Sequence, residues 1–330
     1  MRNGLLTIVG IVLVAVLALG TYLWLAPVGI ADASPNPQPA ASYVAAMTRF
    51  DEIQRQQTAD DSLLPECHSR LYDHGEPTDR VIVLFHGYTN CPAQYHELAD
   101  ELAQLGHTVY VPLMPHHGEA DREHSTLDQL APEQLVAYAN DAADLAGGLG
   151  DQLIVMGLSG GGTVTAYLAQ FRDDIDVAMP MSAFLGLASV PDWLTRPVVN
   201  LAGLLPPVGL GESAVSAASS GVYAPYASFD NNTRAAAAFM RLAQTVLADA
   251  ETTPHRAGRT ILVSNSADDT VNLPLLDTLE RRWEALAPDT STAYTFDASL
   301  GLPHDIIGPD REDQQVDKVY PVLLDLLQNR

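Results

Sequence analysis

A serine set among glycines is the feature of this sequence that most directly suggests chemistry. Ser159 stands in the run Gly-Leu-Ser-Gly-Gly at 157–161, after apolar residues 153–156 and before a stretch of helical character. A Gly-x-Ser-x-Gly between a strand and a helix is typical of a nucleophile elbow, in which a strained turn exposes the serine Oγ and glycines relieve the crowding. Ser159 is therefore the candidate nucleophile, and the N–H of Gly160 is placed to donate to an anion formed there. The alternative is an ordinary glycine-rich turn.

A serine hydroxyl is a weak nucleophile that needs a base within hydrogen-bond reach, and the base must be oriented by a carboxylate. Both kinds of residue follow downstream. Asp268 and Asp269 come after a predicted strand that ends at Val263, and His304 follows the last predicted strand. The chain order Ser, Asp, His is one of three familiar orders of a serine triad. Each residue also has an ordinary interpretation, as a solvated turn aspartate or a loop histidine.

The elements that must position these residues alternate between strand and helix. Apolar strands are predicted at 81–85, 108–111, 153–156, 176–181, 259–263 and 292–296, and helices at 93–105, 132–145, 232–248, 274–286 and 313–327, the last interrupted near Pro321. This alternation predicts an α/β fold with a mostly parallel sheet flanked by helices. Ligands bind such sheets at the carboxyl ends of the strands, where the candidate residues lie.

Four short motifs resemble those of a known family. They are His-Gly-Tyr at 86–88, the run at 157–161, Asp268-x-x-Val271, and His304 followed by aspartate. With them the chain, from about Pro65 to its C-terminus, resembles serine esterases of the α/β-hydrolase fold, of the carboxylesterase and monoacylglycerol-lipase-like kind.

This resemblance implies roles for particular residues. Asp268, in the Asp-x-x-Val turn, would orient His304 in preference to Asp269, the backbone N–H groups of Tyr88 and Gly160 would form the oxyanion hole, and no cofactor would be required. Two features depart from the family pattern. Thr89 stands where lipases with a His-Gly-Gly-Gly run have glycine, and the segment before Val81 is short for eight strands, so one or two early strands are expected to be missing.

The N-terminal segment is predicted to span a membrane. No charged side chain occurs in the 24 residues from Leu5 to Val28, and at about 1.5 Å each they would cover the roughly 30 Å hydrocarbon layer. Arg2 before this segment and acidic residues after it favour an N-terminus inside and a catalytic part outside the cytoplasm. The alternative is a signal peptide cleaved near 31–33, which would give a secreted protein.

The domain organisation follows from these elements. Residues 1–33 form the anchor or signal segment, 34–61 a proline-spaced linker and a docking helix, and 62–330 the catalytic domain. A cap is expected at about 184–231, where the alternation of strands and helices is interrupted and the sequence is rich in Leu, Val, Ala, Pro and Gly. The cap would form an apolar wall for acyl chains, with ordinary packing against the core as the alternative.

Cys67 and Cys91 are the only cysteines, and an even pair in an exported protein is typical of one disulfide. Two separate buried thiols are the alternative. The nearby group of His116, His117, Glu119 and His124 fits no metal-ligand spacing, so no metal site is expected.

The charge composition limits the kinds of molecule that the protein is expected to bind. The formal charge of −24 argues against nucleic acid, which basic surfaces bind. The sequence therefore predicts an extracytoplasmic, membrane-tethered serine hydrolase that cleaves a small-molecule or lipid carboxylic ester. Alternatives are a serine peptidase or acyltransferase on the same fold, and an anchored binding module without activity.

Overall fold

The computed structural model describes residues 2–122, 126–210, 224–228 and 231–328. In this part of the chain a sheet of seven strands has the order β1-β3-β2-β4-β5-β6-β7, and all neighbours are parallel except β1 and β3. The strands are β1 (Arg70–Tyr72), β2 (Thr78–Phe85), β3 (Thr108–Val111), β4 (Gly150–Leu158), β5 (Val177–Met181), β6 (Arg259–Asn265) and β7 (Ser291–Phe296). The predicted α/β fold with a mostly parallel sheet is confirmed.

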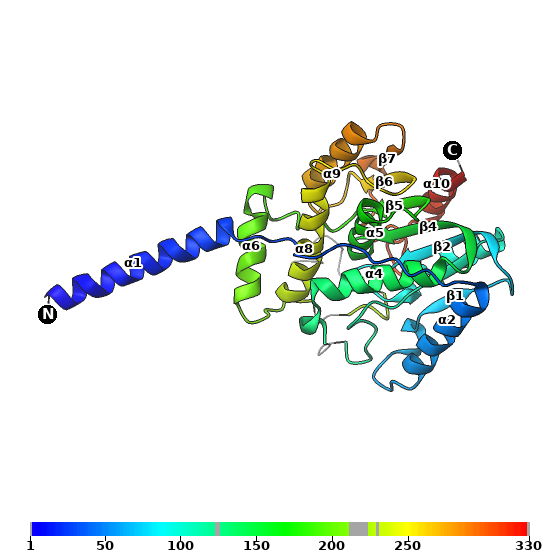
Figure 1. The fold of residues 1–330 in the computed structure, drawn as a ribbon, viewed down its shortest axis with the longest axis horizontal. Helices are drawn as coiled ribbons and strands as arrows, with labels where there is room; N and C mark the ends of the chain where they lie inside the picture. Colours follow the sequence, from blue (N-terminus) through cyan, green and yellow to red (C-terminus); the bar gives the residue numbers. More distant parts are fainter. Residues whose placement is uncertain (1, 123–125, 211–223, 229–230, 329–330) are drawn as a thin grey trace.

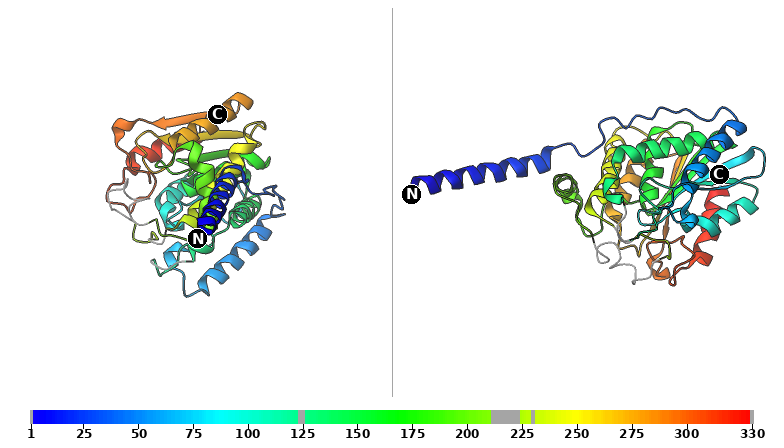
Figure 2. Two further views of the ribbon diagram at one scale, coloured as in Figure 1. Left: turned by 90° about the vertical axis from the view of Figure 1, so that its left-hand side faces the viewer. Right: turned by 90° about the horizontal axis from the view of Figure 1, so that it is seen from below.

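Helices cover both faces of this sheet (Figures 1 and 2). One face packs against α3 (His96–Gln104) and α10 (Val316–Gln328), and the other against α4 (Pro132–Ala146), α5 (Gly160–Phe171) and α9 (Leu273–Leu286). The helix α8 (Thr233–Asp249) packs on α4 and α5. The strands supply apolar side chains to both layers. Within β2, Ile82 and Leu84 point to the first layer and Val83 and Phe85 to the second, as the period-two geometry of a strand requires.

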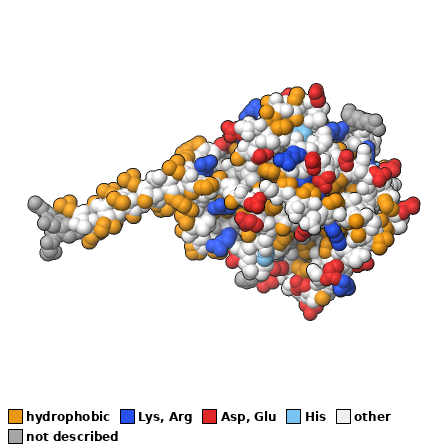
Figure 3. All heavy atoms as spheres, in the orientation of Figure 1, with side chains coloured by type: hydrophobic (Ala, Val, Ile, Leu, Met, Phe, Trp, Pro, Cys, Tyr) orange, Lys and Arg blue, Asp and Glu red, His pale blue; other side chains and the backbone are white. Residues whose placement is uncertain are grey.

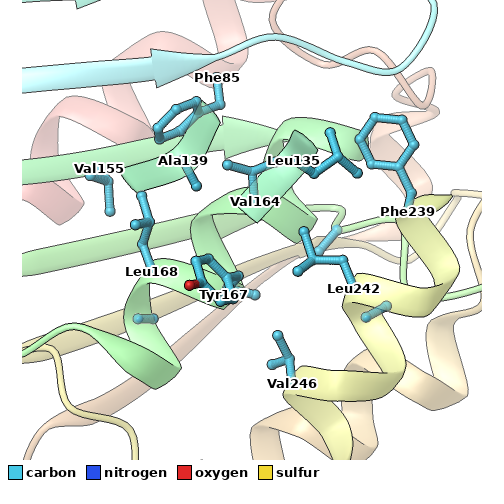
Figure 4. Close-up of a cluster of buried hydrophobic side chains, with 14 of the residues drawn as sticks. Phe85, Leu135, Ala139, Val155, Val164, Tyr167, Leu168, Phe239, Leu242 and Val246 are labelled. Atoms are coloured by element: carbon cyan, nitrogen blue, oxygen red, sulfur yellow. The ribbon is translucent and has the colours of Figure 1, made fainter. Parts of the chain in front are cut away.

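The larger core lies between the sheet and three helices (Figure 4). Val164, Tyr167 and Leu168 of α5 point toward apolar side chains of α4 and α8, while Phe85 and Val155 close the layer from the sheet. Because α5 is buried along almost its whole length, its first residue is fixed relative to the strand ends.

Two further helices precede the sheet. The helix α1 (Arg2–Leu25) projects away from the rest of the molecule. The helix α2 (Tyr43–Thr58) lies on the side of the folded domain that is far from α1 (Figures 1 and 2). The N-cap Ser42 accepts a hydrogen bond from Ala45 N, and Gln57 Oε1 accepts one from Ser69 N at 2.7 Å. A helix is therefore present within the segment 34–61, and it packs on the domain.

Cys67 and Cys91 form a disulfide. Both side chains are fully buried, and the bond joins η1 (Pro65–Cys67) to the start of η2 (Pro92–Tyr95). It closes a loop with a sequence separation of 24, which the chain-entropy model values at about 3 kcal/mol. The predicted bridge is present and ties the segment before the sheet to the loop that follows β2.

The segment before β2 contributes one short strand, β1, so the sheet described here has one strand fewer than eight, as expected from the short segment before Val81. The structure differs from the predicted elements in the last helix. The predicted interruption near Pro321 is wrong, because α10 runs through this proline without a break. Pro321 removes a single helical N–H, whereas burial of Val319, Tyr320 and Leu323 holds both sides of the helix to the sheet.

The strand order creates a crevice at the carboxyl ends of two central strands. The chain continues from β2 to β3 on one side of this pair, and from β4 to β5 on the other side. The loops that follow β2 and β4 therefore lead in opposite directions. Such a topological switch point is where ligands bind in open α/β sheets. The loop of Tyr88 and the turn of Ser159 flank this crevice.

Candidate active site

Ser159 occupies a strained turn between β4 and α5. Its φ of 56° and ψ of −115° fall in a region that costs a non-glycine residue about 1–3 kcal/mol. Neighbouring backbone holds the conformation. Ser159 N donates to Met181 O at 2.9 Å, and its carbonyl accepts from Phe184 N at 2.9 Å and Thr163 N at 3.0 Å.

The glycines around Ser159 are required by close backbone contact. A Cβ on Gly157 would lie 2.2 Å from Gly161 O, and a Cβ on Gly161 would lie 1.8 Å from Phe85 O. A Cβ on Gly162 would come within 2.8 Å of Met181 O. The turn is therefore packed tightly against β2 and β5. This close packing is possible only because glycines occupy these positions.

Asp268 and His304 form a hydrogen-bonded pair. His304 Nδ1 donates to Asp268 Oδ2 at 2.7 Å, and the Asp268 side chain is completely buried while that of His304 is 14% exposed. Asp268 Oδ1 accepts from Thr270 N at 2.9 Å and Val271 N at 3.3 Å. The neighbouring Asp269 is exposed, so the geometry brings Asp268 to the imidazole.

The pair shifts the pKa of each partner. Burial alone would raise the pKa of the Asp268 carboxyl, but the charge of His304 and the hydrogen bonds from His304, Thr270 and Val271 outweigh it and lower this pKa. Burial alone would lower the pKa of His304, but the charge and hydrogen bond of Asp268 raise it above 6.5. The imidazole is thus a stronger base than an ordinary histidine, and Nε2 is the nitrogen left to accept a proton.

Ser159 and His304 line one pocket at the switch point, which we call the central pocket. Its other lining residues are Gly87, Tyr88, Thr89, Asn90, Gln94, Leu158, Phe184, Leu187, Leu210, Ala224, Ala227, Thr270, Asp305 and Arg311. Within the described residues no hydrogen bond joins the Ser159 hydroxyl to the imidazole. Hydrogen bonds of this kind often tighten only when substrate is bound.

The two candidate oxyanion donors belong to backbone segments in contact. A Cβ on Gly160 would lie 3.0 Å from Tyr88 N. Gly160 is the first residue of α5, where an N–H has no acceptor within its own helix. Tyr88 is held by its side chain, because its hydroxyl donates to Asn232 O at 3.0 Å and accepts from Asn232 N at 2.9 Å. Its ring stacks on Phe184.

Histidines near this loop make structural hydrogen bonds. His117 Nε2 lies 2.7 Å from Tyr88 O, and burial lowers the pKa of His117 to about 4, so the neutral ring supports the loop from beneath. His116 and Glu119 both hydrogen-bond to Thr126. No group of three possible metal ligands occurs within the described residues, and His124 lies outside them.

Two buried side chains that the sequence analysis did not single out hydrogen-bond to loops near the central pocket. Gln94 Oε1 accepts from Gly87 N at 2.8 Å and Gln94 Nε2 donates to Asp305 Oδ2 at 2.9 Å, so one buried side chain joins the Tyr88 loop to the His304 loop. Asn265 Nδ2 donates to the carbonyls of Leu302 and Pro303. Each had only a weak signal in the sequence. Gln94 is a polar residue at an otherwise apolar helical position, and Asn265 is a polar residue at the end of a strand.

Comparison with known proteins identifies the family to which this chain belongs. The sequence model of the alpha/beta hydrolase family matches residues 82–315, which confirms the resemblance drawn from the motifs. A thermostable monoacylglycerol lipase of Bacillus sp. (strain H-257) is 28% identical over 114 residues, 34% of this chain and 44% of that protein. The match therefore spans less than half the length of this curated relative.

Solved structures share the fold. A structure reported for LipS and LipT, two metagenome-derived lipolytic enzymes, has a TM-score of 0.60 at 17% identity and covers 81% of this chain and 100% of that one. The monoacylglycerol lipase of Paleococcus ferrophilus has a TM-score of 0.59 at 19% identity, with 78% of this chain and 97% of that one covered.

Proposed function

Because this chain belongs to the alpha/beta hydrolase family, we propose that it is a carboxylic ester hydrolase with Ser159 as nucleophile. The observation that carries the proposal is the 2.7 Å contact between His304 Nδ1 and Asp268 Oδ2, beside the pocket that also exposes Ser159. The lipolytic enzymes among its relatives fit this activity.

The proposed reaction has two halves. Ser159 Oγ attacks the ester carbonyl while His304 Nε2 takes the hydroxyl proton, and Asp268 holds the imidazole in the tautomer that leaves Nε2 free. His304 then gives the proton to the departing alcohol. Water, activated by the same nitrogen, attacks the acyl-enzyme and releases the acid and the serine.

Charge develops on the carbonyl oxygen in each half. The N–H groups of Tyr88 and Gly160 would stabilise this oxyanion, with the N-terminus of α5 adding to the field. Removing one such donor costs about 3–4 kcal/mol in comparable enzymes.

The walls of the central pocket support an apolar acyl group of moderate size. Phe184, Leu187 and Leu210, from the expected cap, line one part of it. Asn90 Oδ1 and Thr270 Oγ1 are buried without a hydrogen-bond partner among the described residues and line the same pocket. A buried polar atom without a partner is costly, so we infer that these two atoms bind polar groups of the alcohol part.

We further propose that α1 anchors the enzyme in a membrane with the catalytic domain outside the cytoplasm. Leu6–Leu25 is long and apolar enough to cross a bilayer, by length and composition, and the disulfide is compatible with an oxidising compartment. The division into anchor, linker with docking helix, and catalytic domain with cap is part of this proposal. Its alternative is signal cleavage near 31–33, and N-terminal sequencing of the mature protein from the membrane fraction separates the two.

A fluorophosphonate probe tests the proposed nucleophile. We expect the wild type to be labelled and Ser159→Ala not to be labelled, with both proteins equally folded by circular dichroism. Equal labelling of the two would reject Ser159. An unlabelled wild type that also leaves p-nitrophenyl esters intact would instead support an inactive binding module, and amide cleavage without ester cleavage would support a peptidase.

A further inference from the structure

The described part of the cap carries an exposed apolar surface that the proposed reaction does not use. In α6 (Asp192–Leu204) the side chain of Trp193 is 64% exposed, and Leu204, Leu205 and Val208 are also exposed. The ten residues 201–210 contain no charged or polar side chain. A contiguous exposed apolar surface marks contact with a protein or a membrane.

The end of α1 is fixed to this surface. Asn200 Nδ2 of α6 donates to Leu23 O and Ala26 O, both at 3.1 Å, and so satisfies carbonyls that the C-terminus of α1 leaves without a helical partner. Trp24 stacks on Trp193 with 5.9 Å between ring centroids and 9° between planes. Figures 1 and 2 show α6 lying crosswise at the end of α1.

These contacts set the level of α6 relative to a bilayer. Leu6–Leu25 spans 20 residues, about 30 Å of helix and therefore the thickness of the hydrocarbon layer. If α1 crosses the bilayer, Trp24 lies at the outer interface, where tryptophan is enriched. A helix that runs crosswise at the same level must lie in that interface.

The exposed apolar side chains of α6 share the face that contacts α1. With 3.6 residues per turn, Trp193, Asn200, Leu201 and Leu204 fall within an arc of about 100°. Trp193 and Asn200 contact the end of α1, so the rest of this arc is directed toward the layer that α1 enters.

The charges near α6 favour lipid as the occupant. The chain has a net charge of −24, yet basic side chains gather with apolar ones on the face at the base of α1, over α6 and α8 (Figure 3). Arg196 on α6 and Arg234 on α8 are exposed, and Arg241 contacts Val28 O at 3.4 Å. Arginine at this level can bind lipid phosphates, whereas a second copy would bring like charges together.

We propose that α6 is an interfacial helix that lies on a phospholipid bilayer spanned by α1, with Trp193, Leu201 and Leu204 against acyl chains and Arg196 at the phosphates. This inference rests on the proposed anchor role of α1 and does not depend on ester hydrolysis. Leu187 and Leu210, which line the central pocket, flank α6 on either side in the chain. On this proposal, the segment that joins these two pocket residues would lie on the membrane.

Tryptophan fluorescence of the full chain in phosphatidylcholine vesicles tests the proposal, because the chain has three tryptophans and Trp283 is buried in the core. Trp24→Phe reports on Trp193, Trp193→Phe reports on Trp24, and the double variant leaves Trp283 as the unquenched control. We expect lipids with brominated acyl chains to remove most of the Trp193 share of the emission in Trp24→Phe. The paired change Leu201→Glu with Leu204→Glu should reduce this quenching.

Each outcome decides the proposal. Quenching in Trp193→Phe but not in Trp24→Phe would leave α1 in the bilayer and overturn the position of α6. No quenching in either variant would remove the anchor and the proposal together. A Trp193 protected from both bromolipid and aqueous iodide would show that a second copy covers the face instead. Because no step measures hydrolysis, failure here is separate from failure of the proposed esterase.

Discussion

Ser159 and His304 reach the same pocket, but the protein holds them by opposite means. The backbone of Ser159 is fixed by main-chain hydrogen bonds to β5 and the segment after it, and by glycines that bring other backbone within van der Waals contact. His304 lies in a loop outside helix and strand. Its position depends on side chains, with Asp268 bonded to its ring and Asn265 to the carbonyls before it.

This difference indicates how the Ser159 turn and the His304 loop should each respond to mutation. Backbone contact at the serine leaves no room for one extra carbon, so a small change there should act on the whole fold. Side-chain hydrogen bonds at the histidine can be removed singly, and each removal should produce a graded loss of activity. Four predictions test this contrast, from the largest expected effect to the smallest.

Gly161→Ala should abolish the native fold. The added Cβ would lie 1.8 Å from Phe85 O, and backbone in two buried elements would have to move, at a cost of about 3 kcal/mol or more. Thermal melting and fluorophosphonate labelling provide the measurement. The control is Gly209→Ala, whose Cβ would meet its nearest atom at 4.0 Å. If both variants melt and label like the wild type, the tight contact between the serine turn and β2 is wrong.

Asp268→Asn should reduce kcat by about 10³–10⁴-fold without unfolding the protein, because an amide can hold the wrong tautomer of the imidazole. Steady-state hydrolysis of a soluble ester gives the value. Asp269→Asn is the matched control, since Asp269 is exposed one position away, and its kcat should stay at the wild-type level. Equal losses in the two variants would contradict the assignment of Asp268.

Gln94→Leu should reduce kcat by about 10–100-fold, an effect equivalent to one or two lost hydrogen bonds. The change leaves Gly87 N and Asp305 Oδ2 without the side chain that joins them, so both loops at the pocket are loosened. KM should change less than kcat, because the residue acts on the positions of other groups.

Gln170→Leu provides the control for Gln94. Gln170 is equally buried and bonds to Asp249 and Trp283 away from the central pocket. Both variants should lose about 1–3 kcal/mol of stability, and Gln94→Leu alone should lose kcat. Gln94→Glu should recover no activity, because it replaces the donor to Asp305 with a second buried carboxylate. A kcat unchanged in Gln94→Leu would remove its positioning role.

The same contrast explains what the sequence could predict. The turn at Ser159 was predictable because a tight backbone contact must be made by glycine, and glycine is visible in a sequence. The central strands β2 to β6 were predictable because most of their side chains are buried on both faces and form apolar runs. Asp268 was distinguishable from Asp269 only through the resemblance to a family.

Long-range side-chain contacts could not be predicted. The Gln94 and Asp305 side chains are separated by 211 positions, and nothing local in either segment indicates the other. The contact of Asn200 with the end of α1 joins residues 174 and 177 positions apart. Pro321 was misjudged for the same reason, since propensity near the proline favoured a break and tertiary packing prevented it.

The smallest expected effect is on the pH dependence of kcat/KM, which depends on both Ser159 and His304. The acid limb of kcat/KM should lie above 6.5, because Asp268 raises the pKa of His304 and protonated imidazole cannot accept the Ser159 proton. Asp268→Asn should move this limb to lower pH, since burial then acts without the opposing charge. Initial rates across the pH range, at substrate concentrations well below KM, give the limb for both proteins.

Stability should change in the opposite direction over the same range. The raised pKa of His304 contributes stability that is fully present below the unfolded value of 6.5 and is lost as pH rises through the folded pKa. The lowered pKa of Asp268 contributes stability that is present above 3.8 and is lost as pH falls through its folded value. The melting temperature of the wild type relative to Asp268→Asn should therefore be highest between these limits and decline as activity rises. A difference that is constant with pH would mean that the two side chains are not coupled in the folded protein, and the imidazole would then have to be positioned by its loop alone.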